Sequence, residues 1–388
     1  MSIERSKMKL LFLIDNRKFV RGGAYSIYKF AEYLARRGHN VFILSNIPPS
    51  FLRDKKLPAI FKIKISPHIN YQFKGSGKIN RLIEDIYYRI LGNRVLGYYQ
   101  PDFIIGHQLL SGIRASQLGK RHQVPIVVFT FESPKWLAFT YWKQINSDRN
   151  RTRYLDDWSK FQEAMNNSKV VFVNSIMTLK KTREDLNKFV NIQVIYPGLP
   201  EILINNGKRK NQIIYIGALI KSKNVNEVIE ALSLTKEPLK LLICGEGYEK
   251  HNLALLAQRR CLNYEFKGVI TDTEKWKLIS ESKFMVFPSS FEGFGMPPME
   301  ALACGIPCIC SDLPIFGEVY EDKVEYFEEH NVNQLAEKMQ YLLDHPDYCQ
   351  RRGEEGRKYV TQKFSWEKSA KKIETILSEN LNKNKQQK

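Results

Sequence analysis

Short apolar runs alternate with longer stretches of helical periodicity along most of the chain. The short runs are rich in β-branched and aromatic residues, as strands are, and the stretches between them place apolar residues three or four positions apart. In the first half the runs are KLLFLID, NVFILS, DFIIG, PIVVFTF, KVVFVNS and IQVIYP, and in the second half QIIYIGAL, LKLLICG, NYEFKG, KFMVFPSS and IPCICS. Strands that alternate with helices predict parallel sheets with helical crossovers. Since the pattern restarts once, we expect an α/β fold of two doubly wound units.

A polar stretch separates the two series of runs. Residues 198–211, GLPEILINNGKRKN, have the Gly, Pro and Asn content of a linker. We therefore predict a first domain over residues 1–204 and a second over residues 205–365, and helical periodicity predicts a further helix over residues 366–382. A chain of 388 residues is also too long for one ordinary core.

Apolar runs and cysteines narrow the classes of protein that the sequence allows. No apolar run approaches the roughly 18 residues that a membrane span needs. The early LLFLI run is interrupted by Asp15 and is too short for the core of a signal peptide. We expect a cytoplasmic protein, either soluble or peripheral to a membrane. None of the six cysteines forms a C-x-x-C pair, so we expect reduced, structural thiols.

The positive charge of the chain is concentrated in its first half. Residues 1–200 contain 33 Lys and Arg against 14 Asp and Glu, whereas residues 201–388 contain 27 of each. A basic half can attract nucleic acid, an anionic membrane or a phosphorylated substrate, or can simply be a solvated surface. Because the first half contains no recognised nucleic-acid-reading motif, we expect no nucleic acid among the partners.

Basic and aromatic residues are interleaved in two segments of that half. Residues 51–100 contain ten Lys and Arg against three acidic residues, and residues 135–154 continue the pattern. Such mixtures suit the interface of an anionic membrane, which is one candidate partner, although aromatic side chains can also belong to a core. The residues concerned are Phe51, Phe61, Tyr71, Phe73, Tyr87, Tyr88, Tyr98, Tyr99, Trp136, Phe139, Tyr141, Trp142, Arg149, Arg151 and Arg153.

The sequence FEGFGMPPMEALACG, residues 291–305, predicts a loop that opens a helix after a strand. The two prolines suit the first helical turn, and Gly305 suits the position just past the helix end. Free N–H groups and the positive end of the helix dipole then point out of the loop, where Gly293 and Gly295 let the backbone approach a ligand closely. Such a loop is typical of a phosphate-binding site.

Two glutamates flank this loop. We expect Glu300 in the first helical turn, where its carboxylate can accept hydrogen bonds from vicinal hydroxyls at the carboxyl edge of the sheet. Glu292, in the loop, can reach hydroxyls on the other side of the phosphates. Hydroxyls, a diphosphate and further hydroxyls together describe a nucleotide sugar. The alternative is that Glu300 caps its helix and Glu292 is solvated.

The segment from Ser289 to Ser311 resembles the retaining nucleotide-sugar glycosyltransferases of family 4. These enzymes, also called glycosyl transferases group 1, share a Glu-x7-Glu motif and the GT-B fold, in which two Rossmann-like domains face each other across a cleft. Further segments that resemble the family are DNRKFVRGGAYSIYKFAEYLARRGHNVFIL, YIGALIKSK, LLICGEG, FKGVITDTEKWKLI and FSWEKSAKKI. The resemblance implies an acceptor-binding first domain, a donor-binding second domain and a last helix, from about Trp366, that packs on the first domain.

The resemblance also assigns roles to residues. It implies that Glu300 holds the nucleotide ribose, that Glu292 lies near the donor sugar and that Lys223 meets the donor diphosphate. Ala218 replaces the arginine that is usual in this loop, so either Lys221 compensates or diphosphate binding is weakened. The nucleotide-binding set that we predict is Glu300, Gly22, Gly23, Gly217, Phe294, Gly295, Met296 and Val269.

His107 completes the predicted catalytic set, with Glu292 and Lys223. It ends the run DFIIG at the carboxyl edge of the sheet, where a plain polar cap is the alternative. The family often has a second histidine after the next strand, but Glu132 stands nearest that place here. Arg21 can meet an anionic acceptor or can be an ordinary surface arginine.

We expect neither a metal nor a cofactor. No Asp-x-Asp motif follows a strand, and Asp156 and Asp157 lie in an amphipathic helical segment where we expect both to be solvated. Charge on a departing diphosphate would then be stabilised by Lys223 and by the helix start at Phe294 to Met296.

Together with these features, the resemblance implies a retaining hexosyltransferase. It would move a hexose, with mannose as one candidate, from a nucleoside-diphosphate sugar to a hydroxyl of a glycan or lipid-linked acceptor at the cytoplasmic face of a membrane. A catalytically degenerate partner subunit is one alternative, suggested by Ala218 and Glu132. A sugar-nucleotide epimerase or hydrolase on the same fold is another.

Overall fold

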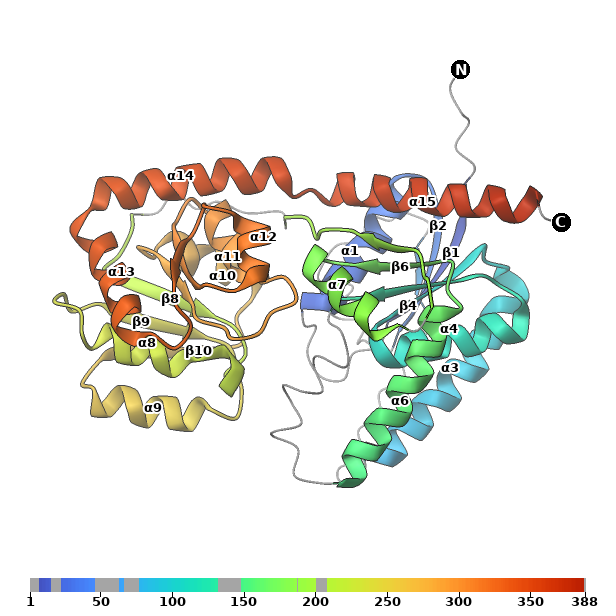
Figure 1. Ribbon diagram of the computed structural model, residues 1–388, viewed down its shortest axis with the longest axis horizontal. Coiled ribbons are helices and arrows are strands. Elements are labelled where there is room, and N and C mark those ends of the chain that lie inside the picture. The colour runs from blue at the N-terminus through green and yellow to red at the C-terminus, as the bar shows by residue number, and fades with distance from the viewer. Residues whose placement is uncertain are drawn as a thin grey trace, which may run out of the picture. The chain divides into compact units, whose positions relative to one another are not determined.

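The computed structural model describes residues 7–14, 22–45, 63–65, 77–131, 148–186, 188–199 and 208–386 (Figure 1). The chain forms two compact units. One comprises Met1–Gly198 together with Trp366–Lys388, and the other comprises Leu199–Ser365. The border at Gly198 lies a few residues before the end that the linker composition predicts for the first domain.

The first unit contains a parallel sheet of seven strands in the order β3-β2-β1-β4-β5-β6-β7. Connections run outward from β1 to β3 on one side and from β4 to β7 on the other, so β1 and β4 form the switch point of the sheet. The strands are β1 Lys9–Ile14, β2 Asn40–Ser45, β3 Ile63–Ile65, β4 Phe103–His107, β5 Ile126–Thr130, β6 Val170–Val173 and β7 Ile192–Val194. The helices are α1 Gly22–Arg36, α3 Gly77–Tyr99, α4 Gln108–His122, α6 Asp148–Asn166, α7 Ile176–Asp185 and α15 Trp366–Gln386.

The strands of the first unit are continuous apolar runs because the sheet is covered on both faces. In β1, Leu10 and Phe12 pack into the cluster that contains α1 and α15 residues, whereas Leu11 and Leu13 pack into the cluster on the opposite face with α3 and α4 residues. Figure 1 shows α3, α4 and α6 on one face of this sheet and α1 and α15 on the other.

Helix α15 completes the core of the first unit, although it follows the whole second unit in sequence. Trp366 packs edge-on against Phe30 at 5.2 Å between ring centroids, and Ser369 donates to the Tyr196 carbonyl at 2.7 Å. Arg37 of the same unit forms ion pairs with Glu367 and Glu374. The helix continues to Gln386, four residues further than the predicted end at 382.

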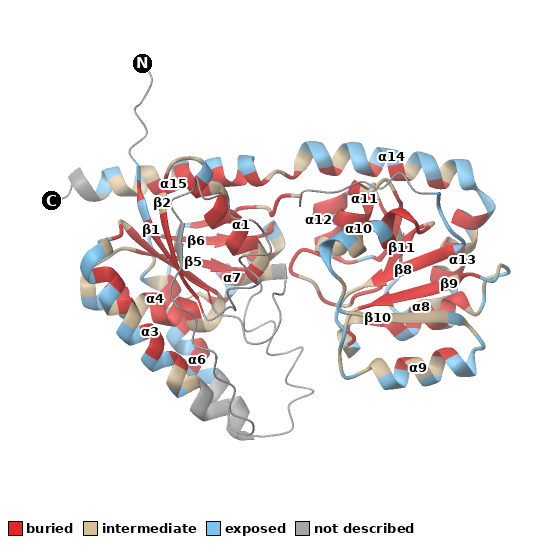
Figure 2. Cartoon of the chain, turned by 180° about the vertical axis from the view of Figure 1, so that it is seen from behind, coloured by how far each residue is buried: buried red, intermediate tan, exposed pale blue. Residues whose placement is uncertain are grey.

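The second unit repeats the plan with a parallel sheet of six strands in the order β10-β9-β8-β11-β12-β13. Its switch point lies between β8 and β11, and Figure 2 shows β8, β9 and β11 buried. The strands are β8 Gln212–Ile216, β9 Lys240–Cys244, β10 Asn263–Gly268, β11 Met285–Phe287, β12 Cys308–Ser311 and β13 Glu325–Phe327. The helices are η1 Lys221–Lys223, a short 3-10 turn, and α8 Val225–Leu232, α9 Lys250–Arg259, α10 Asp272–Ser280, α11 Met296–Ala303, α12 Pro314–Tyr320, α13 Val332–Asp344 and α14 Pro346–Lys363.

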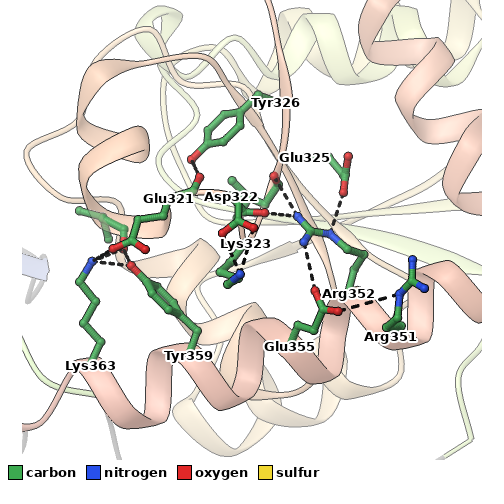
Figure 3. A network of polar contacts seen from close by, with 12 residues as sticks. Glu321, Asp322, Lys323, Glu325, Tyr326, Arg351, Arg352, Glu355, Tyr359 and Lys363 are labelled. Atoms are coloured by element: carbon green, nitrogen blue, oxygen red, sulfur yellow. Dashed lines mark hydrogen bonds and ion pairs between the residues drawn. The ribbon is translucent and has the colours of Figure 1, made fainter.

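A polar network fastens the edge of the second sheet to α14 (Figure 3). Arg352 of α14 donates from Nε to Glu325 Oε1 of β13 at 3.0 Å, and Lys363 lies 2.9 Å from Glu321 Oε1 just after α12. The Tyr326 hydroxyl donates to the Phe316 carbonyl at 2.9 Å. These contacts hold a strand of only three residues in place and fix the end of α14.

The predicted α/β class and its two doubly wound units are confirmed. Each strand predicted from an apolar run is present. The sequence missed β3 and β13, which have three residues each and lie at the edges of their sheets, where burial selects few apolar positions.

Candidate functional site

The loop before α11 presents the start of a helix at the carboxyl edge of the second sheet. Gly295, the residue before the helix, has φ +81, and a Cβ added to it would lie 2.6 Å from the Phe316 ring. The Tyr320 hydroxyl donates to the Gly295 carbonyl and accepts from the Met299 N–H at 3.1 Å. The buried tyrosine therefore fixes the direction of the helix start, which Met296 begins as predicted.

Lys223 and Glu292 meet at this edge from two different loops. Lys223 Nζ lies 2.5 Å from Glu292 Oε1 and donates to the Phe291 carbonyl at 3.0 Å. The Ser289 hydroxyl also donates to Glu292 Oε1, at 3.0 Å. Since β8 and β11 are neighbours, η1 and the loop after β11 bring together side chains that are 69 positions apart. Glu292 is thus held by an ammonium and a hydroxyl.

Asn224 joins the same two loops and was not predicted. Its backbone has φ 46, in the left-handed region that Asn tolerates better than most residues. Its side-chain amide donates to the Pro288 carbonyl at 3.0 Å and to the Ser290 hydroxyl. The Ser290 N–H donates to the Ser222 carbonyl at 2.9 Å. An Asn directly before an apolar-periodic helix was the available signal.

Glu300 lies just past the first helical turn, in which it was predicted. It is the fifth residue of α11, so the expectation of the first helical turn was wrong: α11 begins at Met296, at the glycine cap itself, and its first turn carries no acidic residue. The side chain is buried and its Oε1 lies 2.6 Å from Lys275 Nζ of α10.

Lys275 is a second residue that the sequence did not reveal. Its ammonium lies 4.3 Å from the centroid of the Trp276 ring and 3.5 Å from Asp272. Burial lowers the pKa of Lys275, but Glu300 and Asp272 raise it more, so the net pKa is above the ordinary value for lysine. The amine is therefore charged at neutral pH and pairs the buried carboxylate of Glu300.

The loops after β8 and β9 are pressed together at the same edge. A Cβ added to Gly245 would lie 1.8 Å from the Gly217 carbonyl oxygen, and the Gly217 N–H donates to the Cys244 carbonyl at 2.9 Å. Val269, directly after β10, is exposed. Ala218 places its carbonyl 3.0 Å from the Tyr215 hydroxyl. Lys221 is exposed, so its compensating role stays a prediction.

In the first unit, His107 lies at the switch point between β1 and β4. A Cβ added to Gly23, the second residue of α1, would lie 3.3 Å from His107 Nε2, so His107 and the start of α1 at Gly22 are neighbours. The imidazole packs against Phe131 at 5.1 Å between ring centroids.

His107 is 5% exposed, and neither ring nitrogen has a hydrogen-bond partner in the part of the chain that the structure describes. Burial lowers the pKa of His107 to about 3, so the ring is neutral at physiological pH. Buried polar atoms in native proteins are normally satisfied, so we expect the partners of these two nitrogens to lie outside the described residues.

Asp156 and Asp157 do not form the solvated pair that we expected. Asp156 is exposed and lies 2.7 Å from Lys160, but Asp157 is buried and receives Arg81 of α3, with 2.5 Å between Nη2 and Oδ1. Asp157 is buried because α6 turns it toward Arg81 of α3. No group of three or more His, Cys, Asp or Glu residues within the described ranges is placed to hold a metal ion.

Several predicted residues lie outside the described part of the chain. Glu132 and Arg21 are among them. So are the side chains of Phe51, Phe61, Tyr71, Phe73, Trp136, Phe139, Tyr141, Trp142, Arg149, Arg151 and Arg153. Of the remaining aromatic residues, Tyr87 and Tyr88 are buried in the core under α3, whereas Tyr98 is exposed. No helix among the described residues is long and apolar enough to cross a membrane.

Comparisons with known proteins identify the family. The model described as Glycosyltransferase Family 4 matches residues 20–201, and the model described as Glycosyl transferases group 1 matches residues 202–359. The chain belongs to glycosyltransferase family 4.

The fold of this chain is GT-B, as expected. A crystal structure of HepE from Anabaena in complex with UDP-glucose has a TM-score of 0.75 and covers 96% of this chain and 100% of that chain, at 16% identity. An uncharacterized glycosyltransferase of Methanocaldococcus jannaschii is 30% identical over 217 residues, which cover 55% of this chain and 60% of the relative. The O-antigen chain mannosyltransferase B of Escherichia coli is 27% identical over 161 residues, 40% of this chain and 42% of the relative. The matches thus span only about half of these two relatives.

Proposed function

We propose that this glycosyltransferase is a retaining, metal-independent hexosyltransferase that uses a nucleoside-diphosphate sugar. The observation that carries the proposal is the meeting of Lys223 and Glu292 beside the start of α11. The complex of HepE with UDP-glucose supports a nucleotide-sugar donor, and the mannosyltransferase relative supports mannose as one candidate hexose.

The diphosphate of the donor would bind between Lys223 and the helix start. A departing diphosphate gains negative charge, which the Lys223 ammonium and the N–H groups of residues 294–296 would stabilise from fixed positions. Glu292 and the Phe291 carbonyl already hold the ammonium, so little reorganisation is needed during the reaction. Glu292 would also accept from a hydroxyl of the donor sugar.

Glu300 would bind the ribose hydroxyls of the donor. Its carboxylate is held by Lys275 from the neighbouring helix, so it would meet the ribose in one orientation. Val269 and Gly217 border the same loops and would contact the base and the phosphates through their backbone.

Transfer would occur with retention of configuration at the anomeric carbon. The bond from that carbon to the phosphate oxygen breaks, and the acceptor hydroxyl forms its bond on the face that the phosphate leaves. The proton of the hydroxyl passes to the departing phosphate oxygen, so the products are the glycoside and the nucleoside diphosphate. His107 is neutral and would position a hydroxyl by hydrogen bonding, near Gly22 and Gly23.

The acceptor would be a glycan or a lipid-linked molecule bound by the first unit. The surplus of positive charge in residues 1–200 supports an acceptor that is anionic or lies close to anionic lipid. We place the enzyme at the cytoplasmic face of a membrane on this ground.

Thermal stabilisation by UDP-, GDP-, ADP- and dTDP-sugars tests the donor class. A donor at ~100 times its dissociation constant should stabilise the protein by roughly 2.7 kcal/mol. Transfer from that donor to an acceptor hydroxyl, with the anomeric configuration followed by NMR, then tests the reaction. Inversion would contradict the retaining mechanism, and donor turnover without an acceptor would instead indicate a hydrolase or epimerase. Failure of every donor to bind would indicate a degenerate subunit.

A further inference from the structure

Helix α3 of the first unit exposes a row of aliphatic side chains. Leu82, Ile86 and Ile90 are 60%, 38% and 58% exposed and follow one another at intervals of four, which places them on one side of the helix. The opposite side carries Tyr88 and Val95 into the core. Figure 2 shows exposed positions recurring along α3 beside α4. We call Leu82, Ile86 and Ile90 the outer row.

Four exposed cations flank the outer row. Arg89 and Arg94 are exposed positions of α3, and Lys120 and Arg121 are exposed at the end of α4. None of the four forms an ion pair in the described part of the chain. Arg121 Nη1 donates to Asn93 Oδ1 of α3 at 3.5 Å, so the end of α4 lies against α3.

A hollow between α3 and α4 joins the row to the cations. A pocket of about 540 Å³ has Arg89, Lys120 and Arg121 in its lining. A second pocket of about 360 Å³ shares Arg89 with the first and adds Leu82 and Ile86.

The acidic groups near this hollow are already paired. Asp85 is the one carboxylate among the described lining residues of the two pockets, and it lies 2.7 Å from Arg114 Nη2. Among the described lining residues, Arg89, Lys120 and Arg121 therefore set the charge of the hollow, which is positive.

The outer row and its flanking cations together fit one kind of partner. Nucleic acid would use the cations and stacking rings but would gain little from aliphatic side chains. An anionic bilayer uses both, because aliphatic side chains enter the head-group boundary while cations meet lipid phosphates.

We propose that the outer row and its flanking cations dock this protein on an anionic bilayer surface, with a lipid phosphate in the hollow between α3 and α4. The proposal rests on the membrane placement proposed above, but not on the sugar chemistry. It assigns the docking surface to the aliphatic side of α3, a helix in which Tyr87 and Tyr88, two of the aromatic residues considered in the sequence, are buried.

Co-sedimentation of the full chain with phosphatidylcholine vesicles, with and without phosphatidylglycerol, tests the surface. The wild-type protein should pellet with the anionic vesicles alone and should be released at high salt. Arg89→Ala with Arg121→Ala should lower the partition coefficient about 25-fold, since each cation near the surface contributes ~1 kcal/mol, or about fivefold. Leu82→Ser with Ile90→Ser should lower it roughly tenfold or more.

Lys180→Ala with Arg183→Ala is the matched control, because these two exposed cations lie on α7 of the same unit. The control should bind like the wild type, and all variants should keep donor binding. Wild-type protein that ignores anionic vesicles would overturn the membrane placement itself. Equal pelleting of the wild type and the Leu82→Ser with Ile90→Ser variant would overturn only the assignment of the docking surface to the outer row. Salt-sensitive binding to duplex DNA that survives Leu82→Ser with Ile90→Ser would assign the cations to nucleic acid instead.

Discussion

At the carboxyl edge of the second sheet, Lys223 and Lys275 each hold a glutamate, whereas at the same edge of the first sheet His107 is buried without a hydrogen-bond partner among the described residues. Both edges lie at the switch point of a doubly wound sheet. The second edge thus carries charges that are already oriented for a charged ligand. The first edge carries a neutral ring whose two nitrogens have no partner among the described residues, and a buried polar group left unsatisfied costs roughly 1–3 kcal/mol.

Loss of the Lys223 ammonium should have the largest effect. In Lys223→Ala, we expect turnover to fall about 10²- to 10³-fold, as when one preorganised donor to a developing charge is removed. Steady-state kinetics with a saturating donor measure this effect. Lys221→Ala is the matched control in the same loop, since Lys221 is exposed. Equal losses in both variants would mean that Lys221 shares the role that we give to Lys223.

Separating Glu300 from Lys275 should weaken donor binding. Glu300→Ala removes a charged hydrogen-bond partner, and we expect a loss of about 10- to 100-fold in affinity. Lys275→Met removes the ammonium that lies 2.6 Å from the buried carboxylate and should match or exceed that loss, while Lys275→Arg should restore part of it. Calorimetric titration with the donor or its nucleoside diphosphate measures both. Lys277→Met, at an exposed position of the same helix, should bind normally. Unchanged affinity in Glu300→Ala would remove Glu300 from the site.

Acidification should destabilise the first unit through His107. Burial lowers the pKa of His107 from 6.5 to about 3, so the folded state binds fewer protons than the unfolded state between these values, and stability falls as the pH falls through that window. From about pH 7 to pH 5 the loss is ~2 kcal/mol. Urea unfolding of His107→Phe should show a loss smaller by that amount. His251→Phe, at an exposed position, should keep the pH dependence of the wild type. Identical slopes in all three proteins would contradict a buried neutral imidazole.

Removal of divalent cations should have the smallest effect. If Lys223 and the start of α11 stabilise the departing diphosphate, activity in excess EDTA should equal activity without it. A loss of activity that Mg²⁺ restores would show that the oriented charges of the second edge are insufficient by themselves.

The sequence predicted those parts of the candidate site that lie close together along the chain. Glu292 and the helix start at Met296 follow from the composition of one loop, and Lys223 follows from the family resemblance. Asn224 and Lys275 were missed because their partners, Ser290 and Glu300, lie on other loops and helices, and only the order of the strands brings them together.

The predictions that failed concern which side of a helix a residue faces, toward the core or toward solvent. Asp157 and Asp156 are adjacent, yet one is buried against Arg81 and the other is exposed. Tyr87 and Tyr88 were considered for a membrane interface, but they lie on the core side of α3, while Leu82 and Ile90 are exposed. Periodicity marks α3 as amphipathic only weakly, since both of its sides carry large apolar residues.

The late position of α15 affects the order in which the protein can mature during translation. Ala370, Ile373 and Leu377 are fully buried in the core of the first unit, so that core stays incomplete until these residues leave the ribosome. At roughly 5–20 residues per second, synthesis from Gly198 to Leu377 takes on the order of 10–40 s. Throughout that interval the side of α1 that α15 will cover is open to chaperones and to other nascent chains. The second unit, whose sequence is contiguous, can finish folding first.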